Sequence, residues 1–203
     1  MCSSDLTAFM LTAASTTPLY GKLSDMYGRK PLFVVSISIF LVTSMACGWS
    51  QTIVQLIVFR ALQGLGAGGL MVLAQSTIGD VVKPAERGRY QGIVSGTWAI
   101  ASIAGPPLGG FITSALSWRW VFYVNLPVGL ISLALIIAGL RRGRRPNRHT
   151  IDYTGAGLIA AATTCLLLVL NWAGSLYDWL SPEILGLSGA FVILLGASLL
   201  QES

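Results

Sequence analysis

Arg60 stands deep inside the apolar stretch 52–79, where a charged residue is unusual. Placing a guanidinium in hydrocarbon costs about 2.5–3.5 kcal/mol on insertion scales, so its charge requires a carboxylate, backbone carbonyls or a wet cavity nearby. Gln63 follows one helical turn later and can share the hydrogen bonds of Arg60. We expect Arg60 to face a cavity and to influence the protonation of an acidic partner. The alternative is an arginine that only holds helices together.

The acidic partner of Arg60 is harder to find in the sequence. Asp5 is the other candidate charge, but it lies at the outer end of the first apolar stretch. An aspartate at that place commonly caps a helix N-terminus. We therefore interpret Asp5 as an interfacial cap, and the lack of a convincing proton-binding carboxylate as a sign that the chain is truncated.

A second group of charges occupies residues 20–31, with the sequence Y-G-K-L-S-D-M-Y-G-R-K-P, between two apolar stretches. Asp25 and Arg29 are four residues apart and can pair on a helical turn. Two glycines in this segment are expected to permit tight turns. The simple interpretation is a solvated loop, and the functional one is a gate. The residues that we assign to the gate are Gly21, Asp25, Gly28, Arg29 and Lys30.

Small residues recur along one helical face of the stretch 90–116. They are Gly92, Gly96, Ala101, Gly105 and Gly109. Small residues allow membrane helices to approach closely. Pro106 and Pro107 remove backbone hydrogen bonds and are expected to bend the helix near its outer end. The pattern therefore predicts a bent, tightly packed helix, which would also limit proton leak.

Membrane-spanning helices must position these residues. The 203 residues are 54% hydrophobic and 10% charged, whereas soluble domains carry about 25% charged residues. A bilayer core of about 30 Å needs about 20 helical residues, and none of the apolar runs alternates as a barrel strand would. We predict an all-α, polytopic membrane protein with seven apolar segments at 4–20, 31–49, 52–79, 90–116, 120–140, 154–172 and 182–200.

The distribution of basic residues predicts the orientation of these segments. Eleven of the 13 lysines and arginines lie in the first, third and fifth loops, so these loops are expected on the cytoplasmic side. They are Lys22, Arg29, Lys30, Lys83, Arg87, Arg89, Arg141, Arg142, Arg144, Arg145 and Arg148. Four of the six tryptophans gather at the opposite ends, as interfacial aromatics do. They are Trp118, Trp120, Trp172 and Trp179.

Other classes of function find little support in the sequence. The net charge of +5 lies in short loops, so we expect no nucleic-acid partner. Cys2, Cys47 and Cys165 lack the spacing of metal ligands and predict no metal site or disulfide framework. A membrane-embedded enzyme needs a paired acid and base, and the single histidine, His149, is expected to be a solvated loop residue. We predict no enzymatic activity, no cofactor and, without an ATP-binding motif, transport driven by a gradient.

Three motifs resemble those of the major facilitator superfamily. The first is G-x-L-x-D-x-x-G-R-K at residues 21–30, the second is V-F-R-A-L-Q-G-L-G-A-G at 58–68, and the third is G-P-P-L-G-G at 105–110. The third is associated within the family with antiporters, although the family usually has glycine where this chain has Ala101. The segments 118–127 and 177–182 are similar to fungal fourteen-span drug:proton antiporters.

The resemblance implies a major-facilitator-type bundle that is incomplete and runs from about the second to the eighth span. Residues 1–140 would form the N-terminal bundle without its first helix, 141–153 a basic cytoplasmic loop, and 154–203 two linker-type helices. Arg60, Gln63 and Gly64 would serve transport and proton coupling. The antiporter-type helix motif would comprise Gly96, Ala101, Gly105, Pro106, Gly109 and Gly110.

The function implied is proton-coupled efflux of small amphipathic molecules, of the multidrug or toxin type, by alternating access. We expect a monomer in contact with lipid, in the plasma membrane in preference to the vacuolar membrane. Two alternatives stay open: a transporter of a specific solute, such as a siderophore or an amino acid, and a truncated membrane fragment that does not transport.

Overall fold

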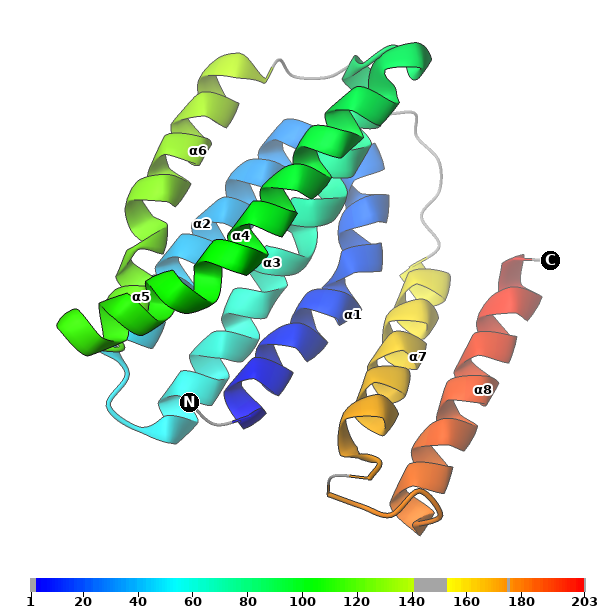
Figure 1. Ribbon diagram of the computed structural model, residues 1–203. Helices are drawn as coiled ribbons and strands as arrows, with labels where there is room; N and C mark the ends of the chain where they lie inside the picture. Colours follow the sequence, from blue (N-terminus) through cyan, green and yellow to red (C-terminus); the bar gives the residue numbers. More distant parts are fainter. Residues whose placement is uncertain (1–2, 141–152, 175, 203) are drawn as a thin grey trace.

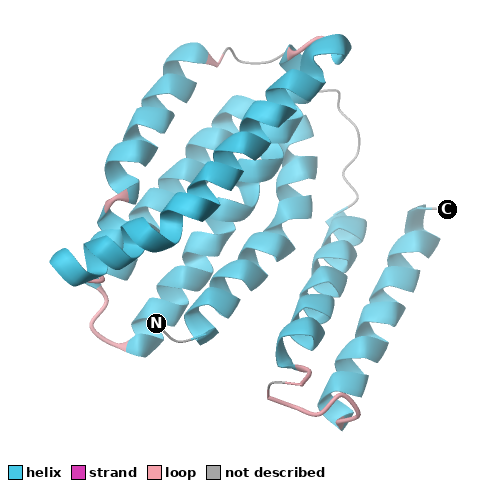
Figure 2. Cartoon of the chain, in the orientation of Figure 1, coloured by secondary structure: helices cyan, strands magenta, loops and turns pink. Residues whose placement is uncertain are grey.

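The computed structural model describes residues 3–140, 153–174 and 176–202. Most of the predicted basic loop, with its five arginines and His149, lies outside the described residues, as does Cys2. The described part is helical and holds no strand, apart from an isolated bridge between Ala173 and Tyr177. The prediction of an all-α fold is therefore confirmed (Figure 2).

Nine helical elements follow one another along the described chain. They are α1 (Ser3–Tyr27), α2 (Arg29–Trp49), α3 (Ile53–Val81), the 3-10 helix η1 (Pro84–Glu86), α4 (Arg87–Ala115), α5 (Trp120–Tyr123), α6 (Asn125–Gly139), α7 (Tyr153–Trp172) and α8 (Pro182–Glu202). Three spans are long and apolar enough to cross a bilayer, namely Arg29–Trp49, Ile53–Val81 and Trp120–Gly139. The chain is an integral membrane protein.

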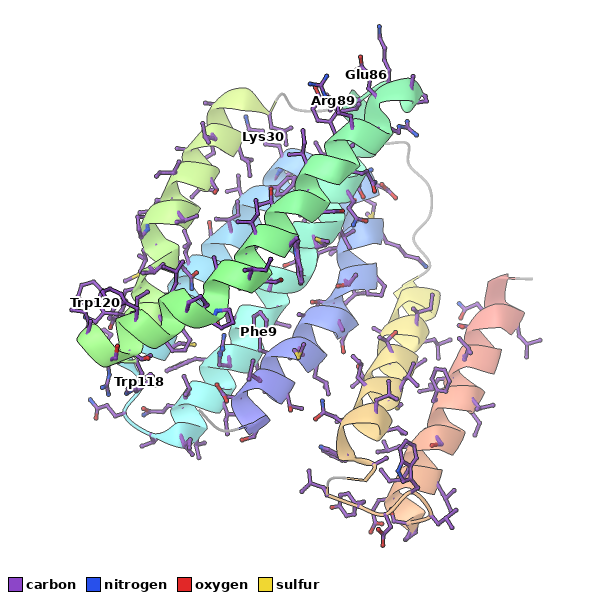
Figure 3. All side chains as sticks on the ribbon, in the orientation of Figure 1. Phe9, Lys30, Glu86, Arg89, Trp118 and Trp120 are labelled. Atoms are coloured by element: carbon purple, nitrogen blue, oxygen red, sulfur yellow. The ribbon has the colours of Figure 1, made fainter. Side chains whose placement is uncertain are left out.

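Helix α3 forms the centre of the N-terminal bundle (Figure 1). It packs along α1 on one side and along α2 on the other, while α6 lies against α2. Helix α7 packs on α1 and pairs with α8, so these two helices extend the bundle on the α1 side. The charged segments and the tryptophan-rich segments lie at opposite ends of the bundle. Figure 3 shows Lys30, Glu86 and Arg89 at one end and Trp118 and Trp120 at the other.

Glycines in α3 set these close helix contacts. A Cβ atom at Gly64 or Gly68 would collide with the backbone and side chains of α1. A Cβ atom at Gly66 would lie 2.7 Å from the Ser36 carbonyl oxygen and the Phe40 nitrogen of α2. Alternate glycines thus admit two neighbouring helices to the α3 backbone, the device by which small residues hold membrane helices together.

The segment 20–31 differs from the predicted loop. Helix α1 continues to Tyr27, so Gly21 lies inside a helix and makes no turn. The chain breaks only at Gly28, whose φ of 86° belongs to the left-handed region that glycine tolerates. Helix α2 begins at the next residue, Arg29, so the charges of this segment are held on two helix ends.

The predicted segment 120–140 is divided into α5 and α6. Pro127 lacks an N–H group, so it cannot donate to the carbonyl of Tyr123, where α5 ends. Two hydrogen bonds to Ser44 of α2 fix the junction between α5 and α6. The Ser44 hydroxyl donates to the Phe122 carbonyl at 2.9 Å and accepts from Asn125 Nδ2 at 3.1 Å.

Helix α4 departs from the tight packing that its small residues predict. In the view of Figure 1 it passes in front of α2 and α3, and none of its side chains is buried. A Cβ atom at Gly92, Gly96, Gly105 or Gly109 would meet nothing within 4 Å among the described residues. The spacing of small residues shows that α4 has a face suited to close packing, but it does not show which helix packs there. Among the described residues, no helix lies against this face.

Candidate functional site

Arg60 meets a buried carboxylate at the α1–α3 interface. Its Nε atom lies 3.7 Å from Asp5 Oδ2, and the Asp5 side chain is fully buried. No described residue donates a hydrogen bond to either carboxylate oxygen of Asp5. The two charges therefore attract each other across a short gap, and the carboxylate keeps both oxygens open to a proton or another donor.

Two aromatic rings enclose the guanidinium of Arg60. Its carbon Cζ lies 5.1 Å from the ring centre of Phe9, on α1, and 5.1 Å from that of Phe122, on α5. Phe122 is 2% exposed and packs edge-on against Trp118, with the ring centres 6.2 Å apart. Ring faces attract a cation, most strongly where water is absent, so the rings hold Arg60 in place beside Asp5.

The helix geometry explains how α1 supplies this site. Asp5, Phe9 and Thr12 are spaced by four and three residues and therefore share one face of α1. That face lies on α3, because Gly64 lacks the Cβ atom that would strike Thr12 and the Phe9 carbonyl. Gly64, which we predicted to serve transport directly, thus brings α1 close enough for Asp5 to reach Arg60.

Asp5 was expected to cap a helix at the membrane surface, and the structure differs. Helix α1 already includes Ser3, so Asp5 lies in its first turn with its side chain turned into the bundle. The acidic partner that Arg60 requires is therefore within the chain. Sequence reasoning missed it because a carboxylate in a first helical turn has the same local signature whether it faces water or a neighbouring helix.

Gln63 completes the polar site. Its Oε1 atom accepts a hydrogen bond from Arg60 Nη1 at 3.1 Å, as the spacing predicts, and the residue is 1% exposed. The buried Cys47 thiol of α2 lies 4.0 Å from the same oxygen. Gln63 thus connects Arg60 to α2, and the site draws on α1, α2, α3 and α5.

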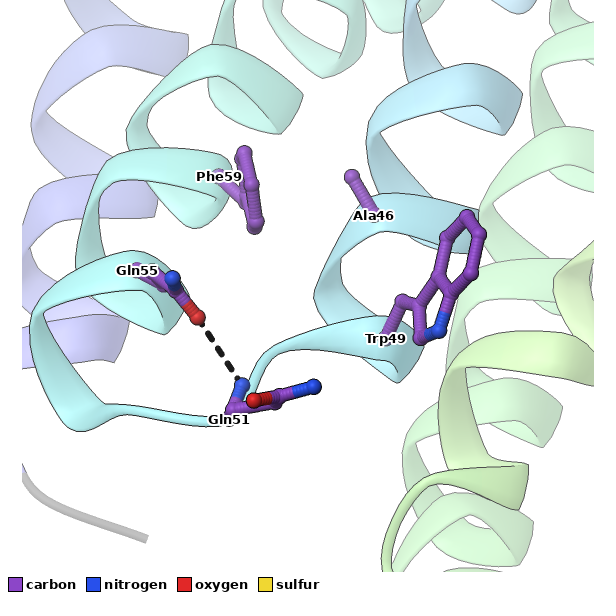
Figure 4. A pocket seen from close by; sticks show the side chains of 5 residues that line it. All are labelled: Ala46, Trp49, Gln51, Gln55 and Phe59. Atoms are coloured by element: carbon purple, nitrogen blue, oxygen red, sulfur yellow. Dashed lines mark hydrogen bonds between the residues drawn. The ribbon is translucent and has the colours of Figure 1, made fainter.

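The site lies near the end of the bundle that carries Trp118 and Trp120 (Figure 3). Arg60 is seven residues from the start of α3, which corresponds to about 10 Å along the axis. A cavity of about 320 Å³ opens nearby between the end of α2 and the start of α3 (Figure 4). Its lining includes Phe59, which packs on the cluster of Cys47, Leu56 and Phe122. Gln55 Oε1 accepts a hydrogen bond from the Gln51 backbone at its rim, at 3.0 Å.

A charge network joins the ends of α1, α2 and α3 that are predicted to face the cytoplasm. Arg29 contacts Asp25 at 3.2 Å, as their spacing predicts, and Asp80 at 2.8 Å. Arg29 also donates to the Ser24 hydroxyl. The sequence analysis assigned no role to Asp80, because its contact with Arg29 joins residues 51 positions apart.

Two further basic residues at this end bind carbonyl groups. Lys30 Nζ donates to the Ile137 carbonyl of α6 at 2.6 Å. Arg87 donates to the carbonyls of Gly79 and Val82, at 2.7 and 3.3 Å, and so satisfies the end of α3. Arg87, at the start of α4, thus caps α3, whereas Asp80 is the charge partner of Arg29.

Metal binding has no support in the described part of the chain, where no three histidine, cysteine or acidic side chains gather in one place. The Arg60 site brings together one acid, one base and one amide. Such a set can exchange a proton and move a charge between two partners.

Comparison with known proteins places the chain in one family. Residues 6–200 match the Major Facilitator Superfamily. The chain is 40% identical over 195 residues to "Multidrug resistance protein 3" of Bacillus subtilis (strain 168), covering 96% of this chain and 38% of that protein. It is 36% identical to "MFS-type efflux pump LUC4" of Fusarium sp, covering 96% and 37%, and 34% identical to "Efflux pump FUS6" of Gibberella fujikuroi, covering 96% and 38%.

The predicted resemblance to efflux proteins of this family, fungal ones included, is thus confirmed. The sequence identity to the bacterial relative, 40%, is slightly higher than the 36% to the fungal LUC4 protein. The chain spans less than two fifths of the length of these relatives.

Proposed function

Because this chain belongs to the major facilitator superfamily, we propose that it forms part of a proton-coupled exporter of small amphipathic molecules. The observation that carries the proposal is the buried Asp5–Arg60 pair, with its carboxylate oxygens open to a donor. Ionisable groups within membrane segments are expensive and typically mark ion pathways. The names of relatives, which describe multidrug resistance and efflux, support export as the direction.

The proposed mechanism uses Asp5 as the proton carrier and Arg60 as its counter-charge. Ionised Asp5 attracts Arg60, whereas a protonated Asp5 does not, so the guanidinium then depends on Gln63 and the two rings. Proton binding would thereby loosen α1 from α3 at the outer end and change which side of the bundle is accessible. Rocking of two bundles about a central site is the mode of action expected of such transporters.

Within this proposal, residues 1–140 form the N-terminal bundle and 154–203 two linker-type helices that follow the basic loop. The open small-residue face of α4 would pack on a further helix and limit proton leak. We place the protein in the plasma membrane, acting as a monomer without enzymatic activity.

The decisive experiment replaces Arg60 by lysine in the protein that the complete transcript encodes. Sequencing the transcript beyond both ends of this reading frame first defines that protein. Lysine keeps the charge but loses the planar fork that reaches Asp5 and Gln63 together. We expect drug export, measured as proton-driven uptake into inverted vesicles, to fall at least about tenfold, equivalent to 1.4 kcal/mol. Wild-type export by Arg60→Lys would refute the role of Arg60. A loss shared by the exposed control Arg89→Lys would show that the assay reports folding only.

We further propose that the Arg29 network is a cytoplasmic gate, which Asp80→Asn and Asp25→Asn would weaken. Each exposed pair is worth about 0.2–1 kcal/mol, so the population of the open state should change by up to about fivefold. The measurement is the rate at which a thiol reagent modifies Thr77→Cys, on α3, in a background lacking the native cysteines. Glu86→Gln removes a carboxylate at the same end and should leave the rate unchanged. Equal rates in all variants would exclude the gate.

A further inference from the structure

Helix α1 presents a second polar face beside the one that carries Asp5. Ser4, Ala8, Leu11 and Ser15 are spaced by four, three and four residues, so they share a face one position away from Asp5 and Phe9. This second face lies against α7. The proton-coupling site proposed above makes no use of it.

Two side-chain hydrogen bonds join α1 to α7. The hydroxyls of Ser15 and Thr164 are hydrogen-bonded at 2.6 Å and close the interface at depth. Toward the outer ends of the helices, Thr7 Oγ1 donates to Asn171 Oδ1 at 3.2 Å. A cavity of about 650 Å³ lies between the two helices around the Thr7–Asn171 contact, and its lining reaches Leu11 and Leu168. Figure 3 shows side chains of both helices directed into the space between them.

The walls of this α1–α7 cavity change from polar to apolar with depth. Near its mouth lie Ser4 and Asn171, with Trp172, whose ring centre is 6.0 Å from that of Tyr177. Deeper along the same two helices lie Leu11 and Leu168. Tryptophan and tyrosine typically mark the level of the lipid headgroups, so the polar mouth stands at the membrane surface and the apolar interior within the hydrocarbon.

The cavity follows the first two turns of α1. From Ser4 to Leu11, the deepest residue of α1 in its lining, α1 rises by seven residues, or about 10 Å. Half of a hydrocarbon core is about 15 Å. The cavity therefore admits the part of a lipid acyl chain that lies next to the headgroup, with the ester carbonyls at the level of Thr7 and Asn171.

We propose that the α1–α7 cavity binds one phospholipid of the outer leaflet, which joins α7 to the bundle. One acyl chain lies between Leu11 and Leu168, and the ester group lies at the level of the polar side chains of Thr7 and Asn171. The bound lipid fills apolar space that α1 and α7 do not fill themselves. This inference rests on contacts of α1 and α7 and is independent of transport.

The test uses the purified full-length product, reconstituted in phosphatidylcholine nanodiscs, transferred to detergent and examined by native mass spectrometry. Ala8→Trp fills the cavity with an indole ring, and Asn171→Leu removes the amide at nearly constant size. Both should retain phosphatidylcholine at least about fivefold less than the wild type. The matched control Leu135→Trp, on the exposed side of α6, should retain one lipid as the wild type does.

Equal retention by all four proteins, or none by the wild type, would overturn the proposal. So would displacement of the lipid by a second copy of the chain, seen as a dimer mass, or by an exported amphipathic compound at equal concentration. If Ala8→Trp fails to fold, judged by gel filtration, Asn171→Leu decides the question alone.

Discussion

Replacing Asp5 by asparagine is expected to abolish proton-coupled export and to destabilise the α1–α3 pair. Asparagine cannot carry the proton, and it leaves the Arg60 guanidinium in a buried site without its counter-charge. Breaking a buried pair from one side typically costs about 3–5 kcal/mol. We expect the lower end of this range, because the two groups are 3.7 Å apart and the remaining Gln63 and aromatic contacts still hold the cation. The free energy of unfolding in mixed detergent measures the loss.

A double variant separates the two consequences of the Asp5 substitution. Asp5→Asn combined with Arg60→Gln removes both charges, so no ion is left buried alone, and most of the lost stability should return. Export should remain absent, because neither a proton carrier nor its counter-charge is present. The control Asp178→Asn, in the exposed loop before α8, should leave stability and export unchanged. Proton-coupled export at wild-type rate in Asp5→Asn would show that the proton is carried elsewhere.

The contacts that sequence reasoning predicted are those within one or two helical turns. The hydrogen bond from Arg60 to Gln63 and the ion pair of Asp25 with Arg29 follow from spacings of three and four residues, whatever the rest of the fold does. The resemblance to a family placed these residues in the right architecture. Local spacing and motif order therefore predicted where the charges gather and which helices carry them.

The contacts that it missed depend on how helices sit against one another. Asp5 reaches Arg60, and Arg29 reaches Asp80, across 55 and 51 positions of sequence. Which face of α1 meets α3 is decided by backbone approach at Gly64 and Gly68, and a sequence pattern does not show which helix a glycine admits. The same limit explains α4, whose small residues predicted a packed face that the described chain leaves open.

The close approach of α1 and α3 can itself be tested, because one helix offers both a sensitive glycine and a matched insensitive one. Gly68→Leu should destabilise the bundle by about 3 kcal/mol or more, at or above the usual cost of overpacking. A Cβ atom there would strike the Ala13 carbonyl and the Thr16 hydroxyl, and the Thr17 hydroxyl, which lies 3.2 Å from the Gly68 carbonyl, would lose its acceptor.

Gly79→Leu is the control for this substitution, since a Cβ atom at that position of α3 would meet nothing within 4 Å. It should unfold like the wild type in the same mixed-detergent titration. Helix separation caused by Gly68→Leu should also move Asp5 away from Arg60, so the variant should lose export together with stability. Equal stability of the two leucine variants would mean that α1 and α3 do not approach as closely as the buried pair requires, and the site built on Asp5 would have to be abandoned.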